Sequence, residues 1–430
     1  MTLTLKSTNR RPFFGKLGFG AWLCLFVAAL WPARVFALGF RIPNQDAAAI
    51  ARGNAFAATA DNPSAIYYNP AGITQLEGHN FQFGILNYLG INTHYESPAG
   101  SESDTDFELI PVPQLHYVYS PQDCQLSFGL GVYAPFGLGV KWPEDSGLRS
   151  LAIESRLQYV TLNPVVAWQP HPTLSLAIGP TLNYSQVEFT RGLIPGFGPP
   201  DFFKFKGNDF SFGFNAGLRW QPDPRFSIGA NFHSASTMDY DGTSSYYSTA
   251  LDAKAKTKAR VPFPQIISGG ISYRPTPKWN IEVGVDYTDW NTLNTVQLAG
   301  SKDLGIGPAL GLPAFDLPVQ FDWHGSWFFE LGVTRQFDNG WFVSGGYFYS
   351  GETAPDNTYT PAVPDTELHV GSLGVGHEGE RWTWVVAMQI IAGPARNVTG
   401  SQQNPFSGES PDGKYQLFVP TVSFSIGYRF

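Results

Sequence analysis

The final stretch of the chain, residues 415–430, alternates bulky apolar side chains with small or polar ones. The bulky positions toward its end are Val422, Phe424, Ile426, Tyr428 and Phe430. Because successive side chains of a strand point to opposite faces, this segment has one apolar face and one small or polar face. Such a strand suits a wall between lipid and a wet or filled lumen. The alternative is an edge strand of a soluble β-sandwich, and we favour the membrane barrel.

The first 37 residues have the pattern of a secretory signal peptide. Four basic residues and no acidic one precede an apolar run at 17–31, and residues 35–37 form the expected cleavage site. The run is about fifteen residues long, shorter than the ~20 that a membrane-spanning helix needs. We therefore predict export and a mature chain of residues 38–430. Cys124 is its one cysteine, which excludes an intramolecular disulfide bond.

The composition agrees with a membrane barrel. Charged residues make up 14% of the chain, against about 25% in a typical soluble protein, whereas aromatic residues reach 15%. A mean hydropathy of −0.13 excludes a helical membrane protein, because only a barrel hides its hydrophobicity in alternate positions. The net charge of −8, without basic stripes of the required kind, gives no reason to expect a nucleic-acid partner.

Alternating segments bounded by turn residues recur along the chain and predict an all-β fold. Fourteen such segments occur, and single-chain bacterial barrels require an even number of strands. Short turns rich in Pro, Asp and Asn alternate with long connections, which predicts tight turns at one end of the barrel and elaborate loops at the other. The long connections are expected near 135–156, 190–207, 237–262, 291–322, 351–366 and 393–414. The predicted strands are 79–90, 109–120, 124–134, 157–169, 172–189, 208–221, 225–236, 263–274, 278–290, 323–337, 340–350, 367–378, 381–392 and 415–430.

Residues 38–77 do not alternate and instead include an Ala-rich stretch, 45–59, that predicts a helix, followed by two Asn-Pro turns. Fourteen strands enclose a lumen too wide for wall side chains to fill, since roughly eight strands is the filled limit. This leader therefore has a place to pack, as a plug inside the barrel.

Several motifs of the chain resemble those of the FadL outer-membrane transporter family, which includes TodX-like transporters of aromatic hydrocarbons. Asn69, Pro70 and Ala71 match the Asn-Pro-Ala motif of the family's N-terminal hatch. The resemblance spans the mature chain in family order. The matching segments are 53–57, 67–72, 112–114, 117–119, 134–138, 270–275, 286–290 and 361–365.

The resemblance implies a transmembrane antiparallel β-barrel of about fourteen strands, residues 78–430, with a hatch, residues 38–77, inside its lumen. It implies passive uptake of long-chain fatty acids or related hydrocarbons across the outer membrane of a Gram-negative bacterium. The substrate would leave sideways at a kink in the third strand, although that strand could instead simply end at Pro135. The kink residues are Gly129, Gly131, Pro135 and Gly137. We also expect the hatch motif to lie close to the seam that the last strand closes.

Apolar residues in two long connections are candidates for substrate capture, because exposed apolar clusters mark binding surfaces. The alternative is that they pack on one another and cap the barrel. The candidates are Phe197, Phe202, Phe203, Leu310, Leu312 and Phe315. Basic residues nearby would meet either a substrate carboxylate or anionic lipopolysaccharide, and we favour the second. These are Lys204, Lys206, Lys254, Lys256, Lys258 and Arg260.

The sequence also indicates which partners the barrel has and which other functions are possible. The terminal pair Tyr428 and Phe430 resembles the signal by which the assembly machinery selects outer-membrane barrels. We expect a monomer surrounded by outer-membrane lipid and lipopolysaccharide, with no metal or other cofactor and no enzymatic activity. A general diffusion porin is the main alternative. A barrel hydrolase is a weaker one, since only 324–326 and 233–234 offer His beside Ser.

Overall fold

The computed structural model describes residues 39–193, 201–249 and 251–430. The predicted signal peptide lies outside these residues. None of the helices among them has the length and apolar character that a membrane-spanning helix needs.

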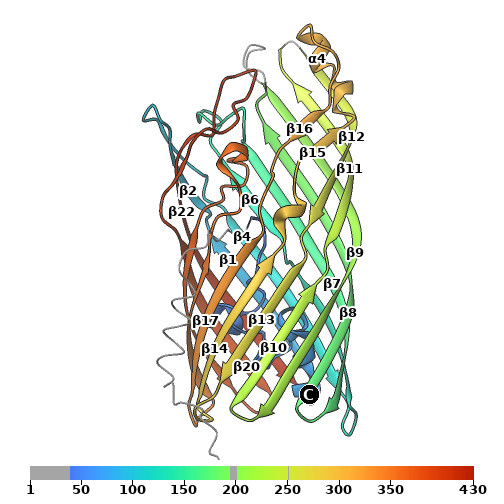
Figure 1. Ribbon diagram of the computed structural model, residues 1–430, viewed down its shortest axis with the longest axis vertical. Helices are drawn as coiled ribbons and strands as arrows, with labels where there is room; N and C mark the ends of the chain where they lie inside the picture. Colours follow the sequence, from blue (N-terminus) through green and yellow to red (C-terminus); the bar gives the residue numbers. More distant parts are fainter. Residues whose placement is uncertain (1–38, 194–200, 250) are drawn as a thin grey trace, which may run out of the picture. The chain divides into compact units, whose positions relative to one another are not determined.

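Fourteen antiparallel strands form a closed wall in which each strand pairs with its neighbour along the chain (Figure 1). The last strand closes the wall against the first, from Asn80 opposite Arg429 to Tyr88 opposite Thr421. The predicted fold is confirmed, and each predicted strand overlaps one wall strand. The wall strands are β1 (Gly78–Leu89), β4 (Leu109–Ser120), β5 (Leu126–Tyr133), β7 (Glu154–His171), β8 (Leu174–Arg191), β9 (Phe202–Asp223), β10 (Phe226–His233), β13 (Ile266–Tyr273), β14 (Trp279–Thr288), β17 (Ser326–Gln336), β18 (Trp341–Ser350), β19 (Leu368–Glu378), β20 (Trp382–Ala392) and β22 (Gly413–Arg429).

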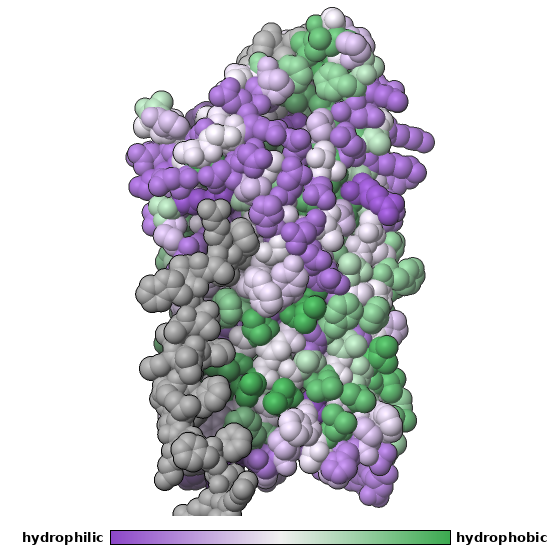
Figure 2. Space-filling model, viewed as in Figure 1, coloured by the Kyte–Doolittle hydropathy of each residue, from purple (hydrophilic) through white to green (hydrophobic). Residues whose placement is uncertain are grey.

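The two faces of the wall differ as the alternation predicts. In β22, Thr421, Ser423 and Ser425 are buried on the inner side, whereas Phe424 between them is exposed. Other strands follow the same rule, and the exposed apolar side chains gather in a hydrophobic band around the lower part of the barrel (Figure 2). This band is the surface that faces lipid in an outer-membrane barrel.

The connections at the upper end contain more structure than the sequence predicts. Both ends of the predicted connection at 190–207 are strand, because β8 runs to Arg191 and β9 begins at Phe202. A further long connection, which the sequence analysis did not count, joins β1 to β4. The outer connections contain further strands and short helices. The strands pair with one another or extend the wall, because backbone groups that leave the barrel still need partners. These strands and helices are β2 (Asn92–Glu96), β3 (Glu102–Asp104), β6 (Gly137–Lys141), β11 (Ser236–Tyr247), β12 (Asp252–Phe263), β15 (Val296–Ala299), β16 (Leu317–Val319), β21 (Arg396–Val398), η3 (Trp290–Thr292), η4 (Ser301–Leu304), α4 (Ile306–Ala309) and η5 (Asp356–Thr358).

Residues 39–77 lie inside the barrel, where nearly all of them are buried (Figure 1). Their helices are α2 (Ala47–Ala51), α3 (Ala65–Tyr68) and η1 (Pro70–Gln75). The long helix expected over 45–59 is wrong. Asp46 caps α2 by accepting a hydrogen bond from the Ala48 N–H, but Gly53 and Asn54 adopt positive φ angles of 60° and 62° and end the helix.

Candidate functional site

The hatch, the segment 39–77, is bonded to the wall through buried polar groups. The carboxylate of Glu282 in β14 accepts hydrogen bonds from the Ala58 N–H at 2.7 Å, from the Thr59 N–H at 3.1 Å and from the Thr59 hydroxyl. Arg219 of β9 donates from Nε to the carbonyl oxygen of Ala58 at 3.1 Å. Two wall strands therefore hold the same hatch turn from different sides.

Asn69 of the hatch motif connects two parts of the hatch with the wall. Its Nδ2 donates to the carbonyl oxygens of Ala57 at 2.7 Å and Leu218 at 3.0 Å, and its Oδ1 accepts from the Ala71 N–H at 3.2 Å. Pro70 suits the first position of η1 because its fixed φ fits a helix and it has no N–H to leave unpaired. The expected place of the motif near the closing seam is wrong, because Leu218 belongs to β9.

Glycines in the wall let the hatch backbone approach closely. A Cβ atom at Gly229 would lie 1.9 Å from the Ala57 carbonyl oxygen, and one at Gly346 would lie 2.0 Å from the Gly53 backbone nitrogen. No side chain fits at these separations, so the wall sequence is adapted to this hatch.

The third wall strand is interrupted at residues 134–136. Below the interruption β5 pairs with both β4 and β7, but above it the chain continues as β6, which pairs only with β7. Pairing of β4 with β5 stops at Leu115 opposite Val132, and the next backbone bond across joins the Asp106 N–H to the Lys141 carbonyl oxygen at 2.8 Å. Within the described residues no ladder joins β4 to β6. The wall therefore has a gap between these two strands.

The predicted kink residues surround this gap in different ways. Gly129 and Gly131 lie within β5, where a Cβ atom would meet the side chain of Ile66 in the hatch at 3.0 Å and 2.8 Å. Pro135 lies in the interruption, and Gly137 begins β6. The first two glycines thus make room for the hatch.

The beginning of the hatch runs along the interruption. The Phe40 carbonyl oxygen accepts from the Gly137 N–H at 2.9 Å, and the Ile42 N–H donates to the Pro135 carbonyl oxygen at 2.8 Å. Arg41 between them forms a buried ion pair with Asp286 at 2.5 Å. Hatch backbone therefore takes up hydrogen-bonding groups that the wall leaves open here.

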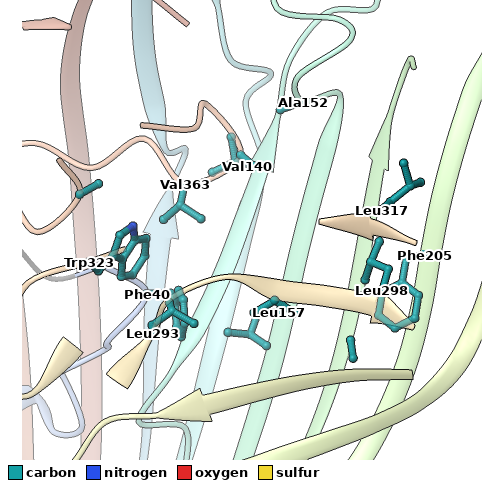
Figure 3. Packing of buried hydrophobic residues seen from close by; sticks show 14 of the residues in the cluster. Phe40, Val140, Ala152, Leu157, Phe205, Leu293, Leu298, Leu317, Trp323 and Val363 are labelled. Atoms are coloured by element: carbon teal, nitrogen blue, oxygen red, sulfur yellow. The ribbon is translucent and has the colours of Figure 1, made fainter. Parts of the chain in front are cut away.

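The Phe40 ring lies at the centre of an aromatic cluster above the hatch. Ring centroids lie 4.6 Å away for Trp290, 5.4 Å for Trp323, 5.6 Å for Phe263 and 6.3 Å for Phe136. Figure 3 shows Phe40 with Trp323 and Leu293 beside it and Leu157 nearby.

Two cavities with largely apolar linings meet at this cluster. The upper cavity, of about 570 Å³, lies among the outer connections, and the lower cavity, of about 460 Å³, lies beside the gap. Phe40, Leu138 and Leu157 line both of them. The main apolar residues of the upper cavity are Val187, Phe189, Phe205, Val261, Phe263, Leu298, Phe315, Leu317 and Phe321.

The lower cavity is lined by residues from both faces of the wall. Its lining includes Leu157 and Tyr159 of β7, which are buried on the inner side, and also Gln158 and Val160, which are exposed on the outer side. It further includes Ile110 and Val112 from β4 and Gly139 from β6, across the gap. The cavity therefore lies at the gap between β4 and β6.

The predicted capture residues are placed in different environments. Phe315 lines the upper cavity, Phe203 is fully buried in the surrounding core, and Leu310 packs against that core. Phe202 is half-buried beneath the guanidinium of Arg149. Leu312 is 48% exposed, and Phe197 lies outside the described residues.

Most cavity-lining residues were missed by sequence reasoning because they belong to strands. Val187 and Phe189 are at the upper end of β8, and Val261 and Phe263 are at the end of β12. A signal for them is present, since inward positions that are small or polar lower in the wall become large and apolar here.

The residues that line the upper cavity include three with charged side chains, of which Arg156 and Glu188 are at outward positions of β7 and β8. Arg156 is paired with Glu154 at 2.5 Å and with Glu108 at 2.7 Å, and Glu188 is paired with Lys204 and Lys206. Arg191 differs from these. Its Nε is buried without a hydrogen-bond partner, and its guanidinium makes no ion pair within 4 Å among the described residues.

Tyr428 and Phe430 lie at the opposite end of the barrel, beside the tight turns. Their rings are 4.8 Å apart, and Tyr428 also packs on Trp382 at 4.5 Å. The Phe430 N–H donates to the His79 carbonyl oxygen at 3.0 Å, which joins the chain end to β1.

The closed wall, the internal hatch and the gap can be compared with known proteins. The chain is 21% identical over 459 residues to the long-chain fatty acid transport protein of Salmonella typhi, which covers 97% of this chain and 100% of the relative. It is 24% identical over 373 residues to outer membrane protein P1 of Haemophilus influenzae, which covers 75% of this chain and 78% of the relative.

Solved structures show the same fold. A FadL homologue of Pseudomonas aeruginosa superimposes with a TM-score of 0.77 at 17% identity and covers 91% of this chain and 99% of the homologue. The toluene transporter TodX of P. putida superimposes with a TM-score of 0.68 at 15% identity and covers 88% and 98%. Residues 28–430 match the family of outer membrane protein transport proteins (OMPP1/FadL/TodX). The chain therefore belongs to this family and is a bacterial outer-membrane β-barrel transport protein.

Proposed function

We propose that the protein takes up hydrophobic compounds with an acidic head group, of the long-chain fatty acid type, by passive movement along an apolar route that ends in the membrane. The cavity beside β4 and β6 carries this proposal, because its lining includes residues from both faces of the wall. A substrate would enter the upper cavity, pass Phe40, reach the lower cavity and leave through the gap.

The physical advantage of this route is that the substrate stays out of water. Each buried CH₂ group is stabilised by roughly 0.8 kcal/mol in an apolar pocket, so a long alkyl chain crosses a water-filled pore poorly. The hatch supports the same conclusion, since its bonds to Glu282, Arg219 and Leu218 close the direct path through the lumen.

Arg191 supports an acidic head group over a neutral hydrocarbon. It lines an apolar cavity, yet Nε has no hydrogen-bond partner among the described residues. A carboxylate would satisfy this buried donor with a charge-assisted hydrogen bond. The relatives' names include a fatty acid transport protein and a toluene transporter, so the family alone leaves this choice open.

A removable cross-link across the gap tests the route. A Cβ atom at Gly139 would lie 2.6 Å from Cδ1 of Ile110, so the two positions face each other from β6 and β4. We expect Ile110→Cys with Gly139→Cys, in a Cys124→Ser background, to block uptake of labelled fatty acid by knockout cells when oxidised and to restore it on reduction. Equal uptake in both states would show that substrate leaves elsewhere.

Substitution of Arg191 tests the substrate class separately. In purified protein, Arg191→Met should weaken binding of a long-chain fatty acid roughly tenfold or more and leave binding of toluene unchanged. Arg225→Met, at an exposed tight turn between β9 and β10, is the matched control. Equal weakening of both ligands would refute the head-group role of Arg191 without affecting the route.

A general diffusion porin is distinguished by conductance. In planar bilayers, the mature protein should have low conductance. A mature protein that lacks residues 38–77 should form an open pore. A large conductance that the deletion leaves unchanged would favour the porin.

A further inference from the structure

The strands β9, β11 and β12 form a three-stranded sheet above the hydrophobic band, and its two faces are unlike. Inward positions are buried and mainly apolar, among them Phe203, Phe205, Tyr240 and Tyr246. The outward side chains of most of β12 and of the upper start of β9 are basic. These are Lys204 and Lys206 in β9 and Lys254, Lys256, Lys258 and Arg260 in β12.

The register of the sheet arranges four of these lysines in two rows. Lys206 pairs with Thr243, which pairs with Lys256 on the other side. The next row is formed in the same way by Lys204, Ser245 and Lys254. Because neighbouring strands are about 4.8 Å apart, the outer two backbones of a row are separated by roughly 10 Å. Two flexible ammonium groups and a hydroxyl between them can therefore converge on one phosphate group.

The positive charge of the rows is incompletely neutralised. Lys204 and Lys206 share the single carboxylate of Glu188. Lys254 and Lys256 form no ion pair among the described residues, since their cross-strand neighbours Ser245 and Thr243 are uncharged.

Acidic residues lie beside the other basic residues of this face. Asp239 pairs with Arg260 at 3.5 Å, and Asp241 is opposite Lys258. Asp252 is exposed at the start of β12. With Glu188 these acidic groups are fewer than the six cations, so positive charge is concentrated here on a chain whose net charge is −8.

The position of the rows along β9 identifies the depth in the membrane at which they lie. The outward side chains that follow Lys206 and Asn208 in this strand are Phe210, Phe212 and Phe214, which are 57%, 78% and 43% exposed. The change from lysine to phenylalanine takes four residues, about 13 Å of strand. Figure 2 shows the corresponding boundary on the visible face, where hydrophilic residues lie directly above the hydrophobic band. The rows thus lie at the level of the lipid head groups.

We propose that the two rows, Lys206 with Thr243 and Lys256, and Lys204 with Ser245 and Lys254, bind phosphate groups of lipopolysaccharide in the outer leaflet. This lipid presents acyl chains to a hydrophobic band and phosphorylated sugars immediately above it. The site places the lipid on the outer surface of the sheet whose inner surface supports the upper cavity. It is separate from the Arg191 head-group site, which faces that cavity.

The proposal is tested with the full-length mature protein in detergent. Native mass spectrometry should detect bound lipopolysaccharide on the wild-type protein, and Lys254→Gln with Lys256→Gln should lower its affinity roughly tenfold or more. Thr243→Val with Ser245→Ala should weaken binding without changing the charge. Lys278→Gln with Arg225→Gln, at two tight turns of the opposite end, is the control for loss of two positive charges.

Dephosphorylated lipopolysaccharide and a fatty acid, as two further ligands, test whether the rows bind phosphate groups. Dephosphorylated lipopolysaccharide should bind the wild type as weakly as intact lipopolysaccharide binds the double lysine variant. Equal binding of both lipids, or equal binding by the wild type and the double variant, would overturn the proposal. Loss of fatty acid binding instead of lipopolysaccharide binding in that variant would also overturn it. Heat-modifiable migration on gels shows that each variant remains a folded barrel.

Discussion

Replacement of Glu282 by Ala tests whether contacts with the wall keep the hatch in place. The carboxylate accepts three hydrogen bonds from Ala58 and Thr59, and each net bond is worth about 1 kcal/mol. Glu282→Ala should therefore lower the free energy of local opening of this turn by about 3 kcal/mol. That change corresponds to a roughly 100-fold larger open population.

Amide hydrogen exchange measures this opening directly. In Glu282→Ala the Ala58 and Thr59 amides should exchange roughly 100-fold faster than in the wild type, and brief openings should appear in planar-bilayer recordings. Thr334→Ala is the matched control, because the Thr334 hydroxyl bonds to Ser344 of the neighbouring wall strand at 2.8 Å. If exchange is unchanged in Glu282→Ala, or equally faster in the control, the hatch is not held by Glu282.

Three further predictions concern other contacts. Gly229→Val should prevent the hatch from packing against the wall, because even a Cβ atom would lie 1.9 Å from a hatch carbonyl oxygen. Trypsin should then cut the hatch of this variant, whereas Gly371→Ala, with open space around it, should remain resistant. Arg396→Met leaves the buried carboxylate of Asp365 without its ion pair, a cost of roughly 3–5 kcal/mol, so proteases should cleave the outer connections faster; an unchanged cleavage rate would contradict this. Deletion of Phe430 should reduce the heat-modifiable barrel in outer-membrane fractions, and a normal amount would exclude a role in assembly.

The wall could be predicted from the sequence because its signal is local. Each strand repeats with a period of two, and Val422, Phe424 and Ile426 show this without reference to any other part of the chain. The hatch is different. Its Ala-rich stretch predicts a long helix by propensity, but the chain turns at Gly53, which has a left-handed backbone and lies so close to Tyr347 of β18 that a Cβ atom would be 2.5 Å from the Tyr347 backbone nitrogen.

The cavities could be predicted only in part, because they depend on how distant segments meet. The loop residue Phe315 lines the upper cavity, but so do Val187 and Phe189, which alternate in the wall like any other strand residue. The gap has a sequence signal in Pro135, which cannot donate a ladder hydrogen bond. That β6 then pairs with β7 and leaves the upper part of β4 without a partner on this side is a property of the register, which composition does not reveal.

The position of Phe40 links the hatch to the proposed route of the substrate. The same ring lines both cavities, while its own backbone bonds to Gly137 at the start of β6. A shift of Phe40 away from the upper cavity would therefore also change the hydrogen bonds that complete the interrupted strand beside the gap. Neighbouring Arg41 limits such a shift, since its buried ion pair with Asp286 is costly to break. On the proposed route, we therefore expect that passage displaces the Phe40 side chain while Arg41 keeps its ion pair and the turn at Ala58 and Thr59 stays bonded to Glu282.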